Sequence, residues 1–190
     1  MALIGCNNFH FAVMTTEDTK TSVPVYDDAK GMTAISGLVK IEVQPQTNSN
    51  TLYADNGAYL TANALGEINV NLETADLPLE IAAKLLGHTY NAETKSIVYS
   101  VNDTAPYVAI AFAAQKADGS TRFVKLYKGK FSEANDDAQT QGNSVEFKTA
   151  SISGKFVIRK DTGDWKKVID AVAGDVDTTS ATFFKTVLDA

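Results

Sequence analysis

The side chains best suited to nucleophilic or general-base chemistry near neutral pH are one cysteine, Cys6, and two histidines, His10 and His88. His10 lies in an alternating, strand-like run, and His88 directly follows a predicted helix; neither has a partner at the spacing of metal ligands. We therefore interpret both histidines as structural or surface residues. A single thiol cannot form a disulfide within the chain, although the fold could still place it beside a histidine.

A second candidate for chemistry is the D-x-D-x-T pattern of residues 175–179, which matches the short pattern of aspartate-nucleophile phosphatases. That pattern works at the end of the first strand of a doubly wound sheet, whereas here it precedes a predicted C-terminal helix. We interpret Asp177, Thr178 and Thr179 as the N-cap of that helix. The sequence has no phosphate-binding loop, dinucleotide fingerprint or nucleophile elbow. We expect a protein that is not an enzyme and needs no cofactor or metal.

Size and charge limit the function further. A chain of 190 residues, 44% of them apolar, predicts a single domain over residues 1–190 with a substantial core. The net charge of -6 argues against a protein that grips phosphate backbones, but it suits a surface past which DNA slides. We find no basic, apolar leader and no run near the roughly 20 apolar residues that span a bilayer. The sequence predicts folding in a cytoplasm and no membrane partner.

Two segments alternate between apolar and polar residues with the period of a half-buried strand. In residues 37–46 the apolar face is Val39, Ile41 and Val43, and in residues 67–73 it is Ile68, Val70 and Leu72. The opposite faces hold only charged and amide side chains: Lys40, Glu42, Gln44, Glu67, Asn69, Asn71 and Glu73. Such faces meet bulk water or line a wet channel, and the pattern alone leaves both possibilities open.

Between these strands, residues 47–63 are rich in Asn, Thr, Ala and Gly and predict a long loop. Asp55, Asn56 and Gly57 indicate a turn, because Asn and Gly tolerate positive φ. Tyr53 and Tyr59 are candidate contact residues, since exposed tyrosine brings contact area at low entropic cost. The alternative is that both tyrosines fold back on their own domain.

The remaining segments predict a mainly β protein. Asp76 (N-cap), Pro78 and Gly87 delimit a helix over 76–86 whose apolar stripe includes Leu79. An all-alanine face at Ala109, Ala111 and Ala113 indicates close approach by another element or subunit. Strands are expected over 96–102, 107–116, 121–131 and 145–159, a loop over 132–142, a strand or short helix over 165–170 and a helix over 179–188. The fold class is an antiparallel β-sandwich or partly open barrel with one flanking helix and a C-terminal helix.

Several runs, taken together and in order, resemble the major tail tube protein family of siphophages of Gram-positive hosts. They are Asn50 to Gly57, Gly66 to Ile68, Glu73 to Pro78, Leu85 to Gly87, Ala105 to Ala109, Leu126 to Phe131, Gly142 to Phe147, Ser153-Gly154 and Asp164 to Lys166. No single run is diagnostic, but the ordered set covers most of the chain.

The resemblance implies a structural virion protein with a phage tail-tube fold. Subunits of such families form hexameric rings whose inner sheets merge, and the rings stack into a tube around a tape-measure protein. Tail tip, initiator and terminator proteins are the further partners, and DNA passes through without specific binding. The seven polar residues of the two strands would face the lumen, with carboxylates that repel phosphate. Tyr53, Asp55, Asn56 and Tyr59 would contact neighbouring subunits or rings.

Two other functions remain possible from the sequence alone. A carbohydrate-binding or adhesin-like β-sandwich would need a concave patch of exposed aromatic side chains. A hydrolase on the same scaffold would need a paired carboxylate or a catalytic triad, which the sequence does not show.

Overall fold

The computed structural model describes residues 2–54, 56–133 and 149–188. Nine strands form one antiparallel sheet in the described chain, and two more form a small separate hairpin. The strands are β1 (Leu3–Thr16), β2 (Val25–Tyr26), β3 (Thr33–Ile35), β4 (Leu38–Ala54), β5 (Gly57–Thr74), β6 (Thr89–Asn91), β7 (Ser96–Val98), β8 (Val108–Lys116), β9 (Thr121–Phe131), β10 (Ala150–Phe156) and β11 (Lys166–Ala171). The helices are α1 (Leu79–Leu86) and α2 (Val176–Phe183).

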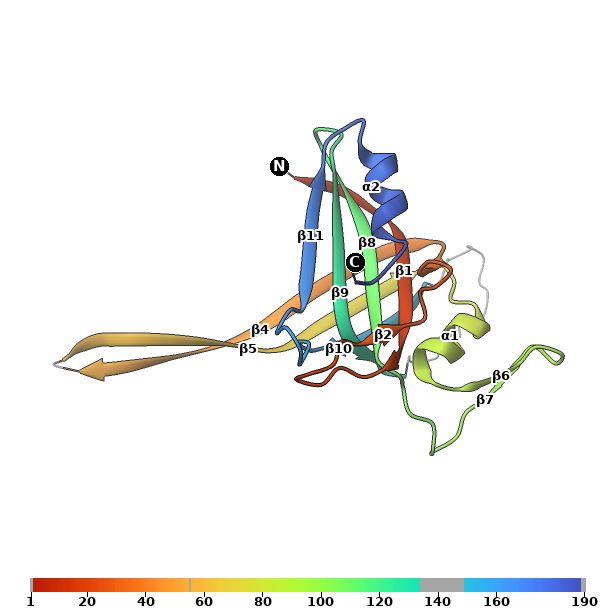
Figure 1. Cartoon of the computed structure of the whole chain (residues 1–190), viewed down its shortest axis with the longest axis horizontal. Coiled ribbons are helices and arrows are strands. Elements are labelled where there is room, and N and C mark those ends of the chain that lie inside the picture. Colours follow the sequence, from red (N-terminus) through yellow and green to blue (C-terminus); the bar gives the residue numbers. More distant parts are fainter. Residues whose placement is uncertain (1, 55, 134–148, 189–190) are drawn as a thin grey trace, which may run out of the picture.

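The sheet follows the order β2-β1-β8-β9-β10-β5-β4, with β3 on β1 and β11 on β9. One edge of β9 pairs with two different strands. Its residues 121–126 pair with β11, and its residues 129–131 pair with β10. The sheet therefore turns over into two layers, and its path does not close in the described chain (Figure 1). This confirms the predicted mainly antiparallel, partly open β architecture.

The main core lies between the two layers. Phe9, Phe11, Ile68, Val70 and Ile110 are among its fully buried side chains. Helix α1 adds Leu85 and Leu86 to the same cluster, so it covers one opening of the sandwich. Gly87 ends this helix in the left-handed conformation at φ 80°, as the sequence predicts.

A second apolar cluster lies on the outer face of β1, β8 and β9. Here Ala109, Ala111 and Ala113 are buried beneath Phe183 and Phe184 from the C-terminal segment. The alanine face is thus explained by an element of the same chain, since small side chains let α2 approach closely (Figure 1).

Several predicted boundaries are wrong. Helix α1 begins at Leu79 with Pro78 as its N-cap, and α2 spans Val176–Phe183 with no side-chain cap, so the capping roles proposed for Asp76 and for Asp177, Thr178 and Thr179 are not observed. Leu79 is half exposed, and the buried residues of α1 are Ala82, Ala83, Leu85 and Leu86. The strand expected over 96–102 ends at Val98, and residues 165–170 lie mostly in a strand. Most of the expected loop over 132–142, and residues 145–148 of the expected 145–159 strand, lie outside the described residues.

Two of the three lysines of β9, Lys125 and Lys128, are buried, and Lys130 is partly buried. Lys125 and Lys128 are each about 1% exposed as whole residues. Lys125 Nζ donates to the carbonyl of Thr186 at 2.7 Å, and Lys128 Nζ donates to the carboxylate of Asp18. Strand β9 contributes side chains to both apolar clusters, so each of its faces is covered.

Candidate assembly and channel surface

A polar face runs across three adjacent strands of the second layer. Strands β4, β5 and β10 pair antiparallel, and their register places polar residues directly opposite one another. The rows are Lys40–Glu73–Ser151, Glu42–Asn71–Ser153 and Gln44–Asn69–Lys155. Six of the seven residues predicted on polar strand faces lie in these rows, and Glu67 adjoins them through its ion pair with Lys155; that this face lines a lumen stays a prediction. Ser151, Ser153 and Lys155 were missed, although their alternation with buried Ile152, Gly154 and Phe156 carries the same period-2 pattern.

The predicted inner face of β4 needs one correction. A bulge lies between the pairs Leu38–Thr74 and Lys40–Glu73, so Val39 has no direct partner on β5. Val39 is 48% exposed, while Leu38, Ile41 and Val43 pack against the core. Leu38 therefore takes the place that the sequence pattern assigns to Val39.

The charges on the polar face are mostly paired. Lys40 Nζ lies 2.7 Å from a carboxylate oxygen of Glu42, and Lys155 Nζ lies 2.7 Å from one of Glu67. The hydrogen bond and charge of Lys40 lower the pKa of Glu42. Glu73 accepts a hydrogen bond from Thr149. Two lysines against three glutamates leave a single net negative charge, so the face is hydrophilic and only weakly repulsive to phosphate.

Strands β4 and β5 continue well beyond the body of the molecule as a two-stranded arm (Figure 1). The prediction of a loop over residues 47–63 is wrong, because these residues pair as two strands from Thr47–Leu65 to Ala54–Gly57, with one register shift between Leu52 and Tyr53. The chain turns where the sequence predicts, and Asn56 has a positive φ of 62°. In the described chain, β10 pairs with β5 only from Ile68 to Thr74, so the arm has two free edges.

The arm carries almost no charge and has large exposed side chains near its end. Between Gln44 and Glu67 the only charged residue is Asp55, which lies outside the described residues. Tyr53 and Tyr59 are 72% and 73% exposed, so they do not fold back on their own domain. Leu52 and Leu60, a cross-strand pair that sequence analysis missed, are 58% and 60% exposed.

Cys6 and His10 contact backbone carbonyls and a ring of their own chain. The thiol of Cys6 donates to the carbonyl of Val39, with Sγ and O 3.7 Å apart. Nδ1 of His10 lies 2.9 Å from the carbonyl oxygen of Asn8, and its ring stacks on Phe184 with centroids 4.2 Å apart. Burial lowers the pKa of His10 below its ordinary value, and the contact with the carbonyl of Asn8 opposes this shift.

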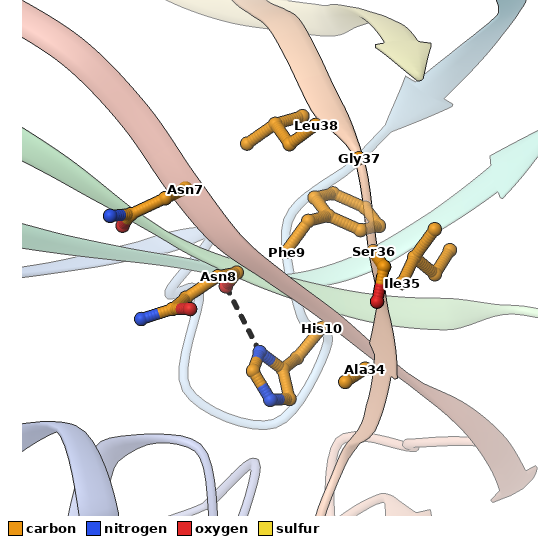
Figure 2. A pocket seen from close by; sticks show the side chains of 9 residues that line it. All are labelled: Asn7, Asn8, Phe9, His10, Ala34, Ile35, Ser36, Gly37 and Leu38. Atoms are coloured by element: carbon orange, nitrogen blue, oxygen red, sulfur yellow. Dashed lines mark hydrogen bonds between the residues drawn. The ribbon is translucent and has the colours of Figure 1, made fainter. Parts of the chain in front are cut away.

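Figure 2 shows His10 at the edge of a cavity of about 350 Å³ between β1, β3 and the start of β4. This cavity is lined by Asn7, Asn8, Phe9, His10 and residues 34–38, and is separate from the polar face. Over the described ranges, no group of three or more His, Cys, Asp or Glu side chains is placed to hold a metal ion. The same ranges contain no helix with the length and apolar character to cross a membrane.

Comparison with protein families identifies the chain. The family model for phage tail tube proteins matches residues 36–164, about two thirds of the sequence. The chain belongs to the phage tail tube protein family. The match includes β4, the arm, β5 and β10, so it contains the whole polar face of this tail tube protein. Membership gives it a structural role in a phage tail.

Structural comparison finds an overall resemblance to a solved structure. This tail tube protein resembles the tube-terminating cap of the anti-feeding prophage, solved by cryo-EM, with a TM-score of 0.47 and 10% identity over 90% of this chain and 95% of that one. No curated protein sequence matches the chain.

Proposed function

We propose that copies of this chain assemble into hexameric rings that stack into a hollow tail tube, through which DNA passes into the host. The observation that carries this proposal is the arm of β4 and β5, which an isolated subunit leaves uncovered. The tube would be assembled in the host cytoplasm around a tape-measure protein. Tip, initiator and terminator proteins would lie at its two ends. The protein would act without catalysis or a cofactor.

The arm has the properties of an assembly element. A two-stranded ribbon is marginal in water, and free edges without charged side chains are open to pairing with another chain. This ribbon combines both features with four large exposed side chains at its tip: Leu52, Tyr53, Tyr59 and Leu60. A second copy of the chain would pair with the arm's edges and cover the tip residues, which makes both the tyrosines and the leucine pair contact candidates.

The polar face of β4, β5 and β10 suits the wall of the channel. It offers amides, hydroxyls and paired charges, with no aromatic side chain in its three rows. Two features hold nucleic acid on a protein surface: aromatic rings on which the bases stack, and clusters of unpaired lysines that bind the phosphates. The polar face has no aromatic rings in its rows, and its lysines are paired with carboxylates. DNA would therefore slide along it rather than bind.

The carbohydrate-binding alternative gains no support from the exposed tyrosines. Sugar recognition of the expected kind needs a concave aromatic patch, whereas Tyr53 and Tyr59 lie near the end of a narrow ribbon (Figure 1). A hollow of about 240 Å³ on the arm is lined by Asn50, Thr51, Leu52, Leu60 and Ala62, without either tyrosine.

Electron microscopy tests the assembly directly. Purified protein examined by negative stain and sedimentation, over a range of concentration and salt, is expected to form hollow tubes of uniform width or rings. Where growth needs initiation, co-expression with tail initiator and tape-measure proteins should produce the tubes. A chain that stays monomeric under both conditions would overturn the proposal.

Cysteine labelling tests which face lines the channel. In a Cys6→Ser background, Asn71→Cys places the only thiol on the polar face. A maleimide coupled to a large polymer should label this thiol quickly in free subunits and at least 10-fold more slowly in tubes, because the polymer cannot enter the lumen. Glu80→Cys on the exposed side of α1 is the matched control and should react at the same rate in both states. Equal labelling of Asn71→Cys in subunits and tubes would exclude the lumen.

A further inference from the structure

His88 lies between two carboxylates that come from separate parts of the chain. Its side chain is only 4% exposed. Nδ1 lies 2.7 Å from Oδ2 of Asp103, in the connection between β7 and β8, and Nε2 lies 2.7 Å from Oε1 of Glu133, just after β9. A neutral imidazole has one N–H and can donate to only one of them. Both contacts are hydrogen bonds only when the ring carries two protons.

The surroundings of the ring favour that charged form. The contacting groups are the carboxylates of Asp103 and Glu133, the ring of Tyr99 with centroids 4.4 Å apart, and the C-terminal end of α1. The amide of His88 itself donates to the carbonyl of Ala83, and the carbonyl end of a helix attracts positive charge. The hydrogen bond to Asp103 raises the pKa of His88; burial opposes this, and Glu133 adds to it.

The contact to Asp103 fixes more than one side chain. Oδ2 of Asp103 also accepts a hydrogen bond from the backbone N–H of Ser100, with N and O 3.0 Å apart. The backbone N–H of Asp103 in turn donates a hydrogen bond to the carbonyl oxygen of Ser100, also at 3.0 Å. The turn held in this way presents Tyr99 and Val101, which are 60% and 103% exposed. His88 therefore connects the end of α1, an exposed turn and the end of β9.

We propose that His88 is a pH-sensitive clamp, which in its doubly protonated form ties the 100–103 turn and Glu133 to the end of α1 and which releases Glu133 when it loses a proton. Asp103 is the more buried carboxylate, at 19% exposure against 61% for Glu133, so the neutral ring keeps its proton on Nδ1. Nε2 then presents a lone pair to the Glu133 carboxylate. Two acceptors at 2.7 Å repel, and the Glu133 side chain turns into solvent.

The sign of the pH dependence follows from the direction of the shift. The pKa of His88 is raised in the folded chain above its ordinary value near 6.5, so the clamp's stabilisation is complete below about pH 6.5. It is lost as the pH rises through the raised folded pKa. The clamp thus opens on the alkaline side, and it does so independently of whether the chain assembles.

Histidine NMR tests the clamp without interference, because the chain has only two histidines. With labelled imidazoles, observed in solution for subunits or by magic-angle spinning for sedimented tubes, a His10→Asn variant assigns the two signals. We expect His88 to titrate above pH 6.5 and the backbone signals of Ser100 and Glu133 to shift with the same midpoint. A His88 midpoint at or below 6.5, or a Glu133 signal that does not follow it, would overturn the proposal.

A pair of conservative variants separates the clamp from general electrostatics. Glu133→Gln removes one carboxylate from the ring and should move the His88 midpoint down by several tenths of a pH unit or more. Glu80→Gln removes an equally exposed carboxylate that pairs with Lys84 on α1, and it should leave the midpoint unchanged. Equal shifts in the two variants would mean that His88 senses only the overall charge. Both changes are on exposed side chains, so neither result depends on a variant that fails to fold.

Discussion

Asp18→Asn is expected to lower the free energy of unfolding by about 3–5 kcal/mol, a large share of the roughly 5–15 kcal/mol typical of a domain. Asp18 and Lys128 form an ion pair whose side chains are 0% and 2% exposed. The Asp18 carboxylate also accepts the amide of Lys160, and Lys128 Nζ lies 4.5 Å above the ring of Tyr107. The side-chain oxygen of asparagine can still accept the hydrogen bond from the backbone N–H of Lys160. It carries no charge, however, so the ammonium of Lys128 stays buried without its counter-charge.

Urea unfolding of unassembled subunits measures this loss as a lower midpoint at unchanged slope. The double variant Asp18→Asn/Lys128→Met should recover much of it, since methionine fills the space of the lysine stem without a charge. Lys40→Gln breaks the exposed pair with Glu42 and should have no measurable effect, because solvent screens that pair. An Asp18→Asn variant as stable as Lys40→Gln would show that the buried pair contributes little.

The ion pair of Asp18 and Lys128 also predicts that its contribution to stability is lost at acidic pH. Burial alone would raise the pKa of Asp18, but the hydrogen bonds from Lys128 and from the amide of Lys160 outweigh it and hold the pKa below its usual value. The stabilisation is therefore complete above the unfolded pKa near 3.9 and is lost as the pH falls through the lower native value. The difference in melting temperature between the wild type and Asp18→Asn should shrink in that range.

Local patterns were enough to predict the strands that have one apolar and one polar face. Residues 67–73 alternate without interruption, and the structure buries Ile68, Val70 and Leu72 as expected. The bulge at Val39 could not be predicted, because Leu38 and Val39 are both apolar and either could face the core. An extra residue in one strand is a property of the pairing, which a single strand's sequence does not contain.

The arm was mistaken for a loop for a related reason. Its Asn, Ala and Gly residues have low strand propensity, and its two strands continue a hairpin whose other end pairs within the body of the molecule. The absence of charge over residues 45–54 and 56–66 was visible in the sequence and indicates a covered surface better than the tyrosines do.

Contacts between distant residues were outside the reach of sequence reasoning. Asp18 and Lys128 are 110 positions apart, and His88 meets Glu133 across 45 positions. A charged residue in an alternating strand normally faces water, so the sequence alone predicts that Lys128 is exposed. Only the fold brings the pair together, and only then does burial make it important for stability.

Removing the arm is expected to abolish tube formation while leaving the subunit folded. Asn48 and Ala64 are direct cross-strand partners, so an Asn-Gly turn in place of residues 49–63 closes a two-residue hairpin at that pair. The core clusters contain no residue of this segment, so the melting temperature of the subunit should change by no more than a few degrees. Electron microscopy and sedimentation should find no tubes at concentrations where the wild type is fully assembled.

Point variants locate the contact within the arm. Leu52→Ser/Leu60→Ser removes the exposed apolar pair and should raise the protein concentration needed for assembly by 10-fold or more, because burial of these side chains would drive docking. Thr51→Ala/Thr61→Ala, one pair closer to the body, removes only a hydroxyl contact of 3.2 Å and should assemble like the wild type. Tubes of normal width from the shortened chain would mean that the body alone makes the ring and stacking contacts. The arm would then need another partner to cover it.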